Sequence, residues 1–226
     1  MKRVFLVRHG ENKANLTHEF SYRKIDYPLT EKGRLQAQQT AQYFETIPID
    51  QIYSSPLRRA QETAEYLSLA KGVPVFIDEH FREVNVGSLE GMPPDEAAWS
   101  QYREVMRHWL SGNSEARFPG GESRRELTER FREGLEILRT AKGQSILLVG
   151  HGGIFTHGVA DLCGIADLRS FFSRENHNCS VSELLVDDSL SRPSFQLIRW
   201  GDVSHLSGIA GELVEGIPEF AKVKYL

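Results

Sequence analysis

The chain of 226 residues carries 27 Lys and Arg against 31 Asp and Glu, a net charge of −4, and 40% of its residues are hydrophobic. This balance is typical of a globular protein with a full core, and it excludes disulfide scaffolds, collagen-like chains and disordered chains. The acidic excess argues against a general nucleic-acid binder, because affinity for a phosphate backbone requires a surplus of Lys and Arg on one face. A local basic pocket remains compatible with it.

The cysteines and the apolar runs bear on location. Cys163 and Cys179 are the two cysteines, and Cys163 lies within an apolar run. This sparse usage is typical of an intracellular protein with reduced thiols, although a single disulfide stays open. The apolar stretch before Arg8 is too short for a signal peptide, and no run approaches the ~18 apolar residues of a membrane helix. We therefore expect a cytoplasmic protein with no membrane partner.

Short apolar runs alternate with segments of helical periodicity. The apolar runs predict strands at Val4–Val7, Ile52–Tyr53, Val75–Ile77, Ile146–Val149, Val181–Val186 and Phe195–Trp200. Helices are expected after Thr30, which can serve as an N-cap, and from Ser55-Pro56, where serine can cap and proline can occupy the first helical position, to about Gly72. Two more are expected from the capping box at Ser123 to about Gly143 and from Gly152 to Gly164. The helix after Thr30 places Leu35, Ala37, Ala41 and Phe44 at near-helical spacing.

This alternation predicts an α/β fold, a three-layer sandwich with a mostly parallel central sheet and helices on both faces. No repeat or linker divides the chain, so residues 1–226 are expected to form a single domain. Residues 90–121 break the alternation, and we expect a short lid-like insertion there. Within it, Trp99, Tyr102, Met106 and Trp109 recur at roughly helical intervals, which is typical of packing, although a roof over a pocket stays open.

Charged side chains follow several of the expected strands. Arg8 and His9 follow the first strand, Arg58 and Arg59 the second, Glu83 the third, and His151, Gly152 and Gly153 the strand that ends near Val149. Ligands of parallel α/β sheets bind at the carboxyl ends of the strands. We therefore expect these residues to converge at one edge of the sheet.

Arginines and imidazoles at one edge would make an anion pocket. The planar fork of arginine pairs with two phosphate oxygens and stays charged at every relevant pH. Backbone N–H groups at Gly152 and Gly153 would add to the pocket if a helix begins there. The sequence thus predicts a small phosphorylated metabolite as the partner.

The same residues divide into catalytic roles. An imidazole attacks phosphorus when a carbonyl holds the proton of one nitrogen and the other nitrogen is free, a role that we assign to His9. Arg8, Arg59 and His151 would neutralise the transferring phosphoryl group. Glu83 would protonate the leaving alkoxide and later activate water.

Four motifs in sequence order carry a resemblance to a known family. LVRHGEN at 6–12, SSPLRRAQETA at 54–64, FREVNVGSLEG at 81–91 and GHGGI at 150–154 resemble the signatures of the histidine phosphatase superfamily, the phosphoglycerate-mutase-like enzymes. The pieces DYPLT at 26–30 and PGGES at 119–123 lie between them in the family's order. The resemblance covers most of the chain and favours the phosphatase branch.

The resemblance implies roles for individual residues. His9 would be the phosphorylated nucleophile, Arg8, Arg59 and His151 the phosphate pocket, and Glu83 the proton donor. Arg59 rather than Arg58 takes this role, because it directly precedes Ala60 of the motif. Asn15 matches an asparagine that contacts phosphate in many members, with a turn cap as the alternative. The family works without a metal or an organic cofactor, so we expect neither.

Departures from the family pattern bear on the reaction. The segment Leu16–Ile25 departs from the pattern of glycine and aromatic residues that many members carry there, so the substrate stays open. The insertion after Gly91 is short, unlike that of cofactor-dependent phosphoglycerate mutases, which favours hydrolysis over mutase transfer. A non-catalytic protein that binds a phosphorylated ligand is a further alternative. A nucleotide-binding module is disfavoured, because no Gly-x-Gly-x-x-Gly or Walker loop occurs at a strand-to-helix turn.

The remaining histidines lack the spacing of metal ligands. His151 and His157 lie six residues apart, which is not the i, i+4 arrangement of a helical zinc pair. His205 is expected to be structural, with an approach to the site left open. We expect no nucleic-acid partner, and a homodimer stays open.

Overall fold

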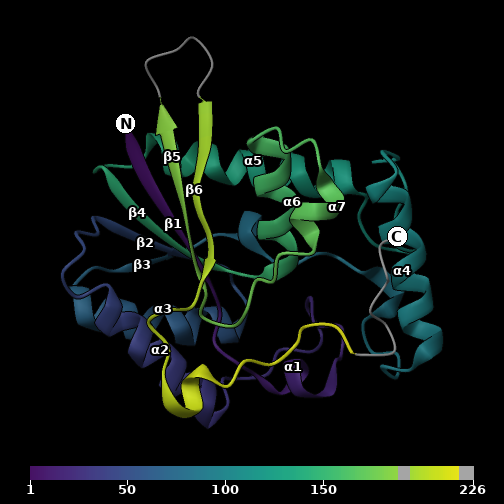
Figure 1. Ribbon diagram of the computed structural model, residues 1–226, viewed down its shortest axis with the longest axis horizontal. Helices are drawn as coiled ribbons and strands as arrows, with labels where there is room; N and C mark the ends of the chain where they lie inside the picture. Colours follow the sequence, from purple (N-terminus) through teal and green to yellow (C-terminus); the bar gives the residue numbers. More distant parts are fainter. Residues whose placement is uncertain (188–193, 219–226) are drawn as a thin grey trace.

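The protein, described here by a computed structural model, is defined over residues 1–187 and 194–218 (Figure 1). Its strands are β1 (Lys2–Arg8), β2 (Gln51–Ser54), β3 (Val75–Ile77), β4 (Ser145–Gly150), β5 (Val181–Asp187) and β6 (Ser194–Asp202). Its α-helices are α1 (Lys13–Thr17), α2 (Glu31–Tyr43), α3 (Arg58–Lys71), α4 (Glu96–Leu110), α5 (Arg124–Thr140), α6 (Gly152–Leu162) and α7 (Leu168–Phe172). Every strand and helix expected from the sequence is present. No helix within the described ranges is both long and apolar enough to cross a membrane.

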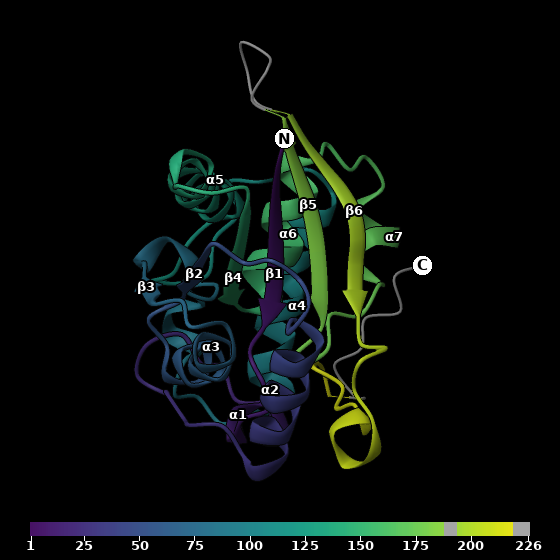
Figure 2. The same cartoon turned by 90° about the vertical axis from the view of Figure 1, so that its left-hand side faces the viewer.

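The six strands form one sheet in the order β3-β2-β4-β1-β5-β6. β1 pairs in parallel with β4, β4 with β2, and β2 with β3, whereas β5 is antiparallel to both of its neighbours. The predicted α/β fold with a mostly parallel sheet is confirmed. At the β5–β6 end the chain departs from the alternation, because these two consecutive strands pair directly. The carboxyl ends of β1, β2 and β4 meet at one edge, shown at the bottom of Figure 2.

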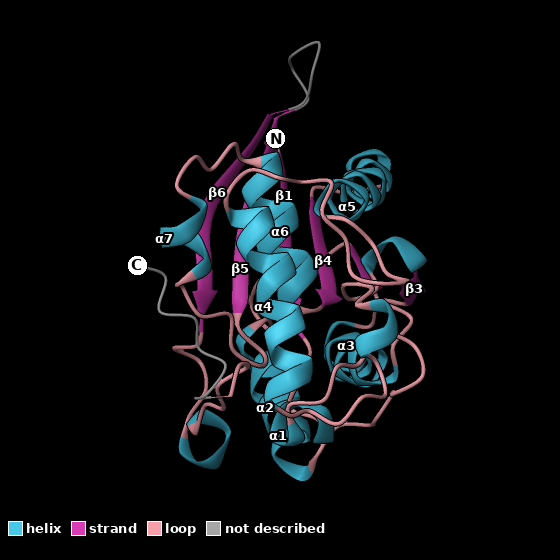
Figure 3. Cartoon of the chain, turned by 90° about the vertical axis from the view of Figure 1, so that its right-hand side faces the viewer, coloured by secondary structure: helices cyan, strands magenta, loops and turns pink. Residues whose placement is uncertain are grey.

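Helices cover both faces of the sheet because the side chains of each strand alternate between two cores. Phe5 and Val7 of β1 pack in a core with residues of α2 and α3, which lie in front of the sheet in Figure 2. Val4 and Leu6 point the other way, into a core shared with α5 and α6 (Figure 3). Both sets of β1 side chains are almost completely buried. A strand buried on both faces is typical of a parallel sheet between two helical layers.

The helix caps agree with the sequence at two of three tested sites. Thr30 caps α2 by accepting from Gly33 N at 3.0 Å, and Ser123 caps α5 through a capping box with Glu126. The expected start of α3 at Ser55 was wrong. The helix begins at Arg58 without a side-chain cap from its N-cap residue, because the Ser55 hydroxyl hydrogen-bonds to a histidine ring instead. On α2, Leu35 is 42% exposed and does not share the burial of Ala37, Ala41 and Phe44.

Residues 90–121 contain α4, whose C-terminal Trp109 contacts His157 of α6, with ring centroids 4.8 Å apart (Figure 3). Asp95 caps this helix by accepting from Ala98 N at 3.0 Å. Trp109 is buried at the other end of the helix, and its indole N–H donates to Ala116 O at 2.6 Å. These contacts anchor both ends of α4. A lid-like movement of the segment stays a prediction.

Candidate active site

His9 lies directly after β1, at the carboxyl edge of the sheet. Its backbone N–H continues the ladder to β4 by donating to Gly150 O at 2.9 Å. Its ring Nδ1 lies 2.7 Å from Gly10 O. Because a carbonyl can only accept, this contact places the ring proton on Nδ1 and leaves a lone pair on Nε2. The side chain is 3% exposed, so the surrounding protein fixes this orientation.

Arg59, on the first turn of α3, faces the free nitrogen of His9. Its Nε donates to His9 Nε2 at 3.1 Å. Its two terminal nitrogens donate to the hydroxyl and to the carbonyl oxygen of Ser21, both at 3.0 Å. Asp26 lies 3.8 Å from the guanidinium and adds a charged partner. The loop that carries Ser21 therefore fixes the plane of the arginine fork.

A buried carboxylate holds that loop. Glu90 is 7% exposed, and one oxygen, Oε1, accepts from four consecutive backbone N–H groups. The donors and distances are Tyr22 at 2.7 Å, Arg23 at 2.6 Å, Lys24 at 2.9 Å and Ile25 at 3.2 Å. The Ser21 hydroxyl also donates to Ile25 O within the same loop. A chain of hydrogen bonds thus connects Glu90 through the loop and Ser21 to Arg59.

Arg8 is the last residue of β1 and directly precedes His9. One terminal nitrogen donates to the carbonyl oxygen of Asn176, in the segment before β5. Its Nε–H is buried and has no hydrogen-bond partner in the described part of the chain. A Cβ on Gly152 would lie 3.5 Å from this Nε, so the first turn of α6 packs beside the guanidinium.

His151 lies directly after β4, and its ring is fully buried. The ring centroids of His151 and His9 are 5.2 Å apart. Its Nε2 lies 2.7 Å from the hydroxyl of Ser55, which also accepts from Leu57 N at 3.3 Å. Because the described chain offers the Ser55 hydroxyl proton no other acceptor, we assign this proton to Nε2 and the ring proton of a neutral His151 to Nδ1. That Nδ1 is buried and has no partner among residues 1–187 and 194–218.

Glu83 lies at the N-terminus of α6, where the helix leaves backbone N–H groups without partners. Its carboxylate accepts from Gly153 N at 3.1 Å and from Ile154 N at 2.9 Å. It also accepts from its neighbour Val84 N at 2.9 Å. These backbone donors at the start of the helix fix the position of the Glu83 carboxyl group. The neighbouring Arg82 forms an ion pair with Glu79 at 2.8 Å and not with Glu83.

The electrostatics of the cluster keep its histidines neutral. Burial, and then the positive charges of Arg59 and Arg8, hold the pKa of His9 well below 6.5. Burial and the nearby Arg59 do the same to the pKa of His151. Burial lowers the pKa of Arg59 to about 10, and also lowers the pKa of Arg8, although Glu83 opposes both shifts. At neutral pH the site holds two arginine cations and two neutral imidazoles.

Asn15 lies close to the cluster through a hydrogen-bonded bridge. Its side-chain oxygen accepts from Asn12 N at 3.0 Å in a capping box at the start of α1. The same oxygen accepts from the Asn178 amide at 3.1 Å, and that amide also donates to His9 O at 3.0 Å. The turn cap is therefore present, and a contact of Asn15 with phosphate stays a prediction.

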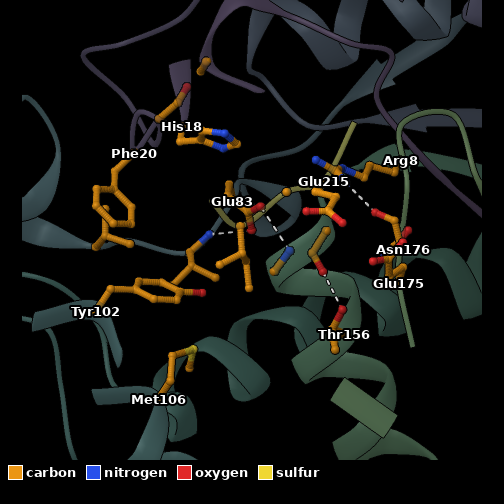
Figure 4. A pocket seen from close by; sticks show the side chains of 18 of the residues that line it. Arg8, His18, Phe20, Glu83, Tyr102, Met106, Thr156, Glu175, Asn176 and Glu215 are labelled. Carbon is orange, nitrogen blue, oxygen red and sulfur yellow. Dashed lines mark hydrogen bonds between the residues drawn. The ribbon is translucent and has the colours of Figure 1, made fainter. Parts of the chain in front are cut away.

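A cavity of about 480 Å³ opens beside this cluster. Arg8, Arg59, Glu83, Gly152 and Gly153 are among the residues that line it. Figure 4 shows Glu83 near the centre, Phe20, Tyr102 and Met106 on one side, and Arg8, Asn176 and Glu175 on the other. Within the described chain, no group of three or more His, Cys, Asp or Glu side chains is placed to hold a metal ion.

The structure brings together Arg8, His9, Arg59, Glu83, His151 and Gly152 at the predicted edge. Other candidates lie apart from it. The Arg58 side chain is 61% exposed and pairs with Glu62. His205 packs on Tyr43 and contacts the Thr40 hydroxyl at 3.1 Å.

Sequence reasoning missed several residues that hold the cluster. Ser55 directly follows β2, a position that is typical of site residues, although its sequence context predicts a helix cap. Ser21, Glu90 and Asn178 had no comparable signal, because each acts through a contact with a segment far away in the chain. These contacts depend on the tertiary fold.

Comparisons with known proteins agree with this geometry. A family model described as histidine phosphatase superfamily (branch 1) matches residues 4–202. A protein of Hydrogenobacter thermophilus named as a candidate phosphoserine phosphatase is 34% identical over 194 residues, covering 84% of this chain and 93% of the relative. An Escherichia coli protein named as a candidate phosphoglycerate mutase, GpmB, is 34% identical over 215 residues, covering 93% of this chain and 97% of the relative.

Solved structures show the same architecture. A mycobacterial glucosyl-3-phosphoglycerate phosphatase superposes with a TM-score of 0.75 at 25% identity, covering 89% of this chain and 99% of that chain. A phosphoserine phosphatase from Entamoeba histolytica has the same fold, with a TM-score of 0.74 at 23% identity over 91% of this chain and 99% of that chain. The family match extends over most of the chain and includes every strand of the sheet. The chain therefore belongs to the histidine phosphatase superfamily, branch 1.

Proposed function

We propose that this phosphatase hydrolyses a small phosphate monoester through a phosphohistidine on His9, with Glu83 as the proton donor. The observation that carries the proposal is the state of the His9 ring. Gly10 O holds its Nδ1 proton at 2.7 Å, and Nε2 keeps its lone pair toward Arg59. A neutral imidazole whose proton is held on one nitrogen and whose other nitrogen is unprotonated is the form that attacks phosphorus.

Unpartnered donors around His9 support the phosphate pocket. The Nε–H of Arg8 and the Nδ1–H of His151 are buried without a hydrogen-bond partner in the described chain. Buried donors are satisfied in nearly all native sites, so a ligand oxygen that accepts from them would relieve a real cost. Together with the fork of Arg59 they would surround the three equatorial oxygens of a phosphoryl group in transfer.

In the proposed reaction His9 Nε2 attacks phosphorus while the P–O bond to the alcohol breaks. Glu83, in its protonated form, gives a proton to the leaving alkoxide. The resulting carboxylate then accepts a proton from water, whose oxygen attacks the phosphohistidine and releases inorganic phosphate and neutral His9. The backbone donors of Gly153 and Ile154 keep Glu83 in place through both steps.

A mutase is the second candidate, because the Escherichia coli relative named as a candidate phosphoglycerate mutase aligns with 93% of this chain. The two reactions share the phosphohistidine and differ in the group that accepts the phosphoryl group, water or a substrate hydroxyl. Release of inorganic phosphate with 3-phosphoglycerate supports hydrolysis. Formation of the 2-phospho isomer without phosphate release supports the mutase.

Acid-quench labelling tests the nucleophile. With a 32P-labelled substrate, the wild-type protein should retain acid-labile, alkali-stable phosphate on His9. His9→Ala should lose the label and at least ~10³-fold in kcat. Full turnover by His9→Ala would disprove the proposal, and saturable binding without phosphate release across a broad panel of esters would support the non-catalytic binder instead.

Glu83→Gln tests the proton donor. This variant should slow esters with poor alkoxide leaving groups far more than p-nitrophenyl phosphate, because p-nitrophenolate leaves without a proton. Equal losses with both kinds of substrate would assign Glu83 a positioning role.

We also propose that the protein acts in the cytoplasm on a small metabolite, without nucleic acid or membrane as a partner. The two thiols, Cys163 and Cys179, are both free, which suits a reducing compartment. Cell fractionation tests the location, and sedimentation tests the homodimer that the sequence left open.

A further inference from the structure

We infer that the alcohol part of the substrate is apolar, with an aromatic ring, and bears no carboxylate. The inference rests on the proposed function, since it concerns the part of the cavity beyond the phosphate pocket. The side chains on this wall are uncharged: Phe20, Val84, Val86, Trp99, Tyr102 and Met106. They come from the loop before Ser21, from the segment after Glu83 and from α4.

The aromatic part of the wall is built before any ligand binds. The ring of Phe20 lies 4.7 Å from that of Trp99 and 5.4 Å from that of Tyr102, measured between centroids. Trp99 and Tyr102 are 5.2 Å apart in an edge-to-face arrangement, and Tyr102 stacks on Phe118 at 5.5 Å. Rings held by one another lose little freedom when a ligand packs against them.

The wall is continuous with the phosphate pocket. Phe20 immediately precedes Ser21, whose hydroxyl and carbonyl oxygens hold Arg59. Val84 immediately follows Glu83. A phosphate ester bound at Arg59 with its bridging oxygen near Glu83 would therefore direct its alcohol part against this wall.

The chemistry of the wall discriminates between alcohols. A benzyl group would exchange water for apolar contacts along it, and each buried carbon would favour binding. A carboxylate directed against this wall would lose water without gaining a cation there, because none of the six wall side chains carries a charge. The rest of the cavity lining contains both cations, Arg8, Arg59 and Arg174, and carboxyl groups, Glu19, Glu83, Glu175 and Glu215. The volume of about 480 Å³ is also within the range of cavities that enclose ligands larger than a three-carbon acid.

Steady-state phosphate release tests the inference with esters of similar alcohol reactivity. Benzyl phosphate should exceed ethyl phosphate and 3-phosphoglycerate by roughly tenfold or more in kcat/KM, a ratio expected from one apolar group in a fitted pocket. A preference for 3-phosphoglycerate or phosphoserine over benzyl phosphate would overturn the inference while leaving the proposed function intact. Phosphate release from none of these esters would instead disprove the proposed function.

Wall variants locate the preference. Tyr102→Ala and Met106→Ala should each lower the ratio of kcat/KM for benzyl to ethyl phosphate at least threefold. Because both substrates are measured on one preparation, a partly unfolded sample does not change the ratio. Val105→Ala is the matched control, since Val105 is a buried apolar residue on the same helix but outside the cavity lining, and its ratio should stay at the wild-type value. An unchanged ratio in both wall variants would overturn the inference.

Discussion

The Nε of Arg59 lies 3.1 Å from the Nε2 of His9, so the nitrogen that would attack phosphorus accepts a hydrogen bond from a guanidinium. This contact has two effects. It fixes the ring with its lone pair directed into the phosphate pocket, and the nearby positive charge disfavours protonation of the ring. An entering phosphate oxygen would take over the Nε–H of Arg59 and release the lone pair for attack.

The protonation state of His9 can be observed directly. In 15N spectra at pH 7, His9 should be neutral with its proton on Nδ1, and its titration midpoint should lie well below 6.5, because burial and two arginines disfavour the cation. Arg59→Gln should move the midpoint upward by removing one of these charges. A midpoint at or above 6.5 in the wild-type protein, or a proton on Nε2, would contradict the geometry of the site.

Buried neutral histidines predict that the fold weakens in mild acid. Burial holds the pKa values of His9, His151 and His157 well below 6.5 in the folded protein. The unfolded chain binds protons at these sites as the pH falls below 6.5, so the free energy of unfolding is largest above 6.5 and decreases below it. Each histidine contributes up to about 1.4 kcal/mol per pH unit.

Urea unfolding at pH 7.5, 6.5 and 5.5 measures this slope above the range in which most carboxylates titrate. His157→Gln supplies the control, because His157 is buried between Trp109 and Phe172 rather than beside the arginine cluster. Its slope should decrease by up to about a third relative to wild type, because His9 and His151 still contribute, as do His18 and His205, whose pKa values burial also lowers. A wild-type stability that is constant between pH 7.5 and 5.5 would refute the prediction.

Glu90 is expected to act on phosphate binding without touching the phosphate. Glu90→Ala leaves four backbone N–H groups of the 22–25 loop without their acceptor and loosens Ser21, which holds Arg59. We expect a loss of about 2–4 kcal/mol in unfolding free energy and a rise in KM for p-nitrophenyl phosphate of roughly tenfold. Glu90→Gln, which keeps one carbonyl acceptor, should recover part of both.

Asp50→Ala separates this effect from simple destabilisation. Asp50 also accepts from two backbone N–H groups, those of Gln144 and Ser145, but at the opposite end of β4. This variant should lose stability and keep the wild-type KM. Equal changes of KM in Glu90→Ala and Asp50→Ala would show that the loop does not position Arg59.

The glycines at the start of α6 form a matched pair. A Cβ on Gly153 would lie 2.7 Å from the Glu83 carboxylate, whereas one on Gly152 would meet nothing closer than 3.5 Å, at Arg8. Gly153→Ala should therefore displace Glu83 and lower kcat for an alkyl ester by roughly tenfold or more. Gly152→Ala should fold with equal or slightly higher stability, because alanine favours a helix by up to about 1 kcal/mol. Thermal unfolding measures the stability of both variants, and turnover of an alkyl ester measures their kcat. Equal kcat values in the two variants would contradict the prediction that the position of Glu83 depends on Gly153.

The sequence predicted the sheet and the central site residues for a common reason. Strands buried on both faces, such as Ile146–Val149, appear as unbroken apolar runs, and the residues that follow them stand at the carboxyl edge. His9, Arg59 and His151 were identifiable because each stands within a motif placed at such an edge. Their meeting in space follows from the parallel pairing of β1, β4 and β2.

What could not be predicted depends on packing between distant segments. The helices α1 and α7 have five residues each, too few to display a helical period. Leu35 belongs to the apolar set expected on α2, yet it is 42% exposed, because residues two positions apart point to nearly opposite sides of a helix and Leu35 lies away from the side that buries Ala37 and Ala41. Glu90 lies more than sixty residues from the 22–25 loop that it holds. It binds this loop through backbone N–H groups, which every residue except proline has, so no sequence pattern indicates the contact.

The close packing of Gly10, next to His9, against Gly33 has a consequence for how the enzyme meets its ligand. A Cβ on Gly10 would lie 2.5 Å from Gly33 O, and one on Gly33 would lie 2.1 Å from Glu11 O. The loop after β1 is therefore seated against the first turn of α2, backbone on backbone. Conformational entropy at this loop is lost during folding, before any substrate arrives. The imidazole should thus meet an incoming ester without a preceding rearrangement of its own backbone.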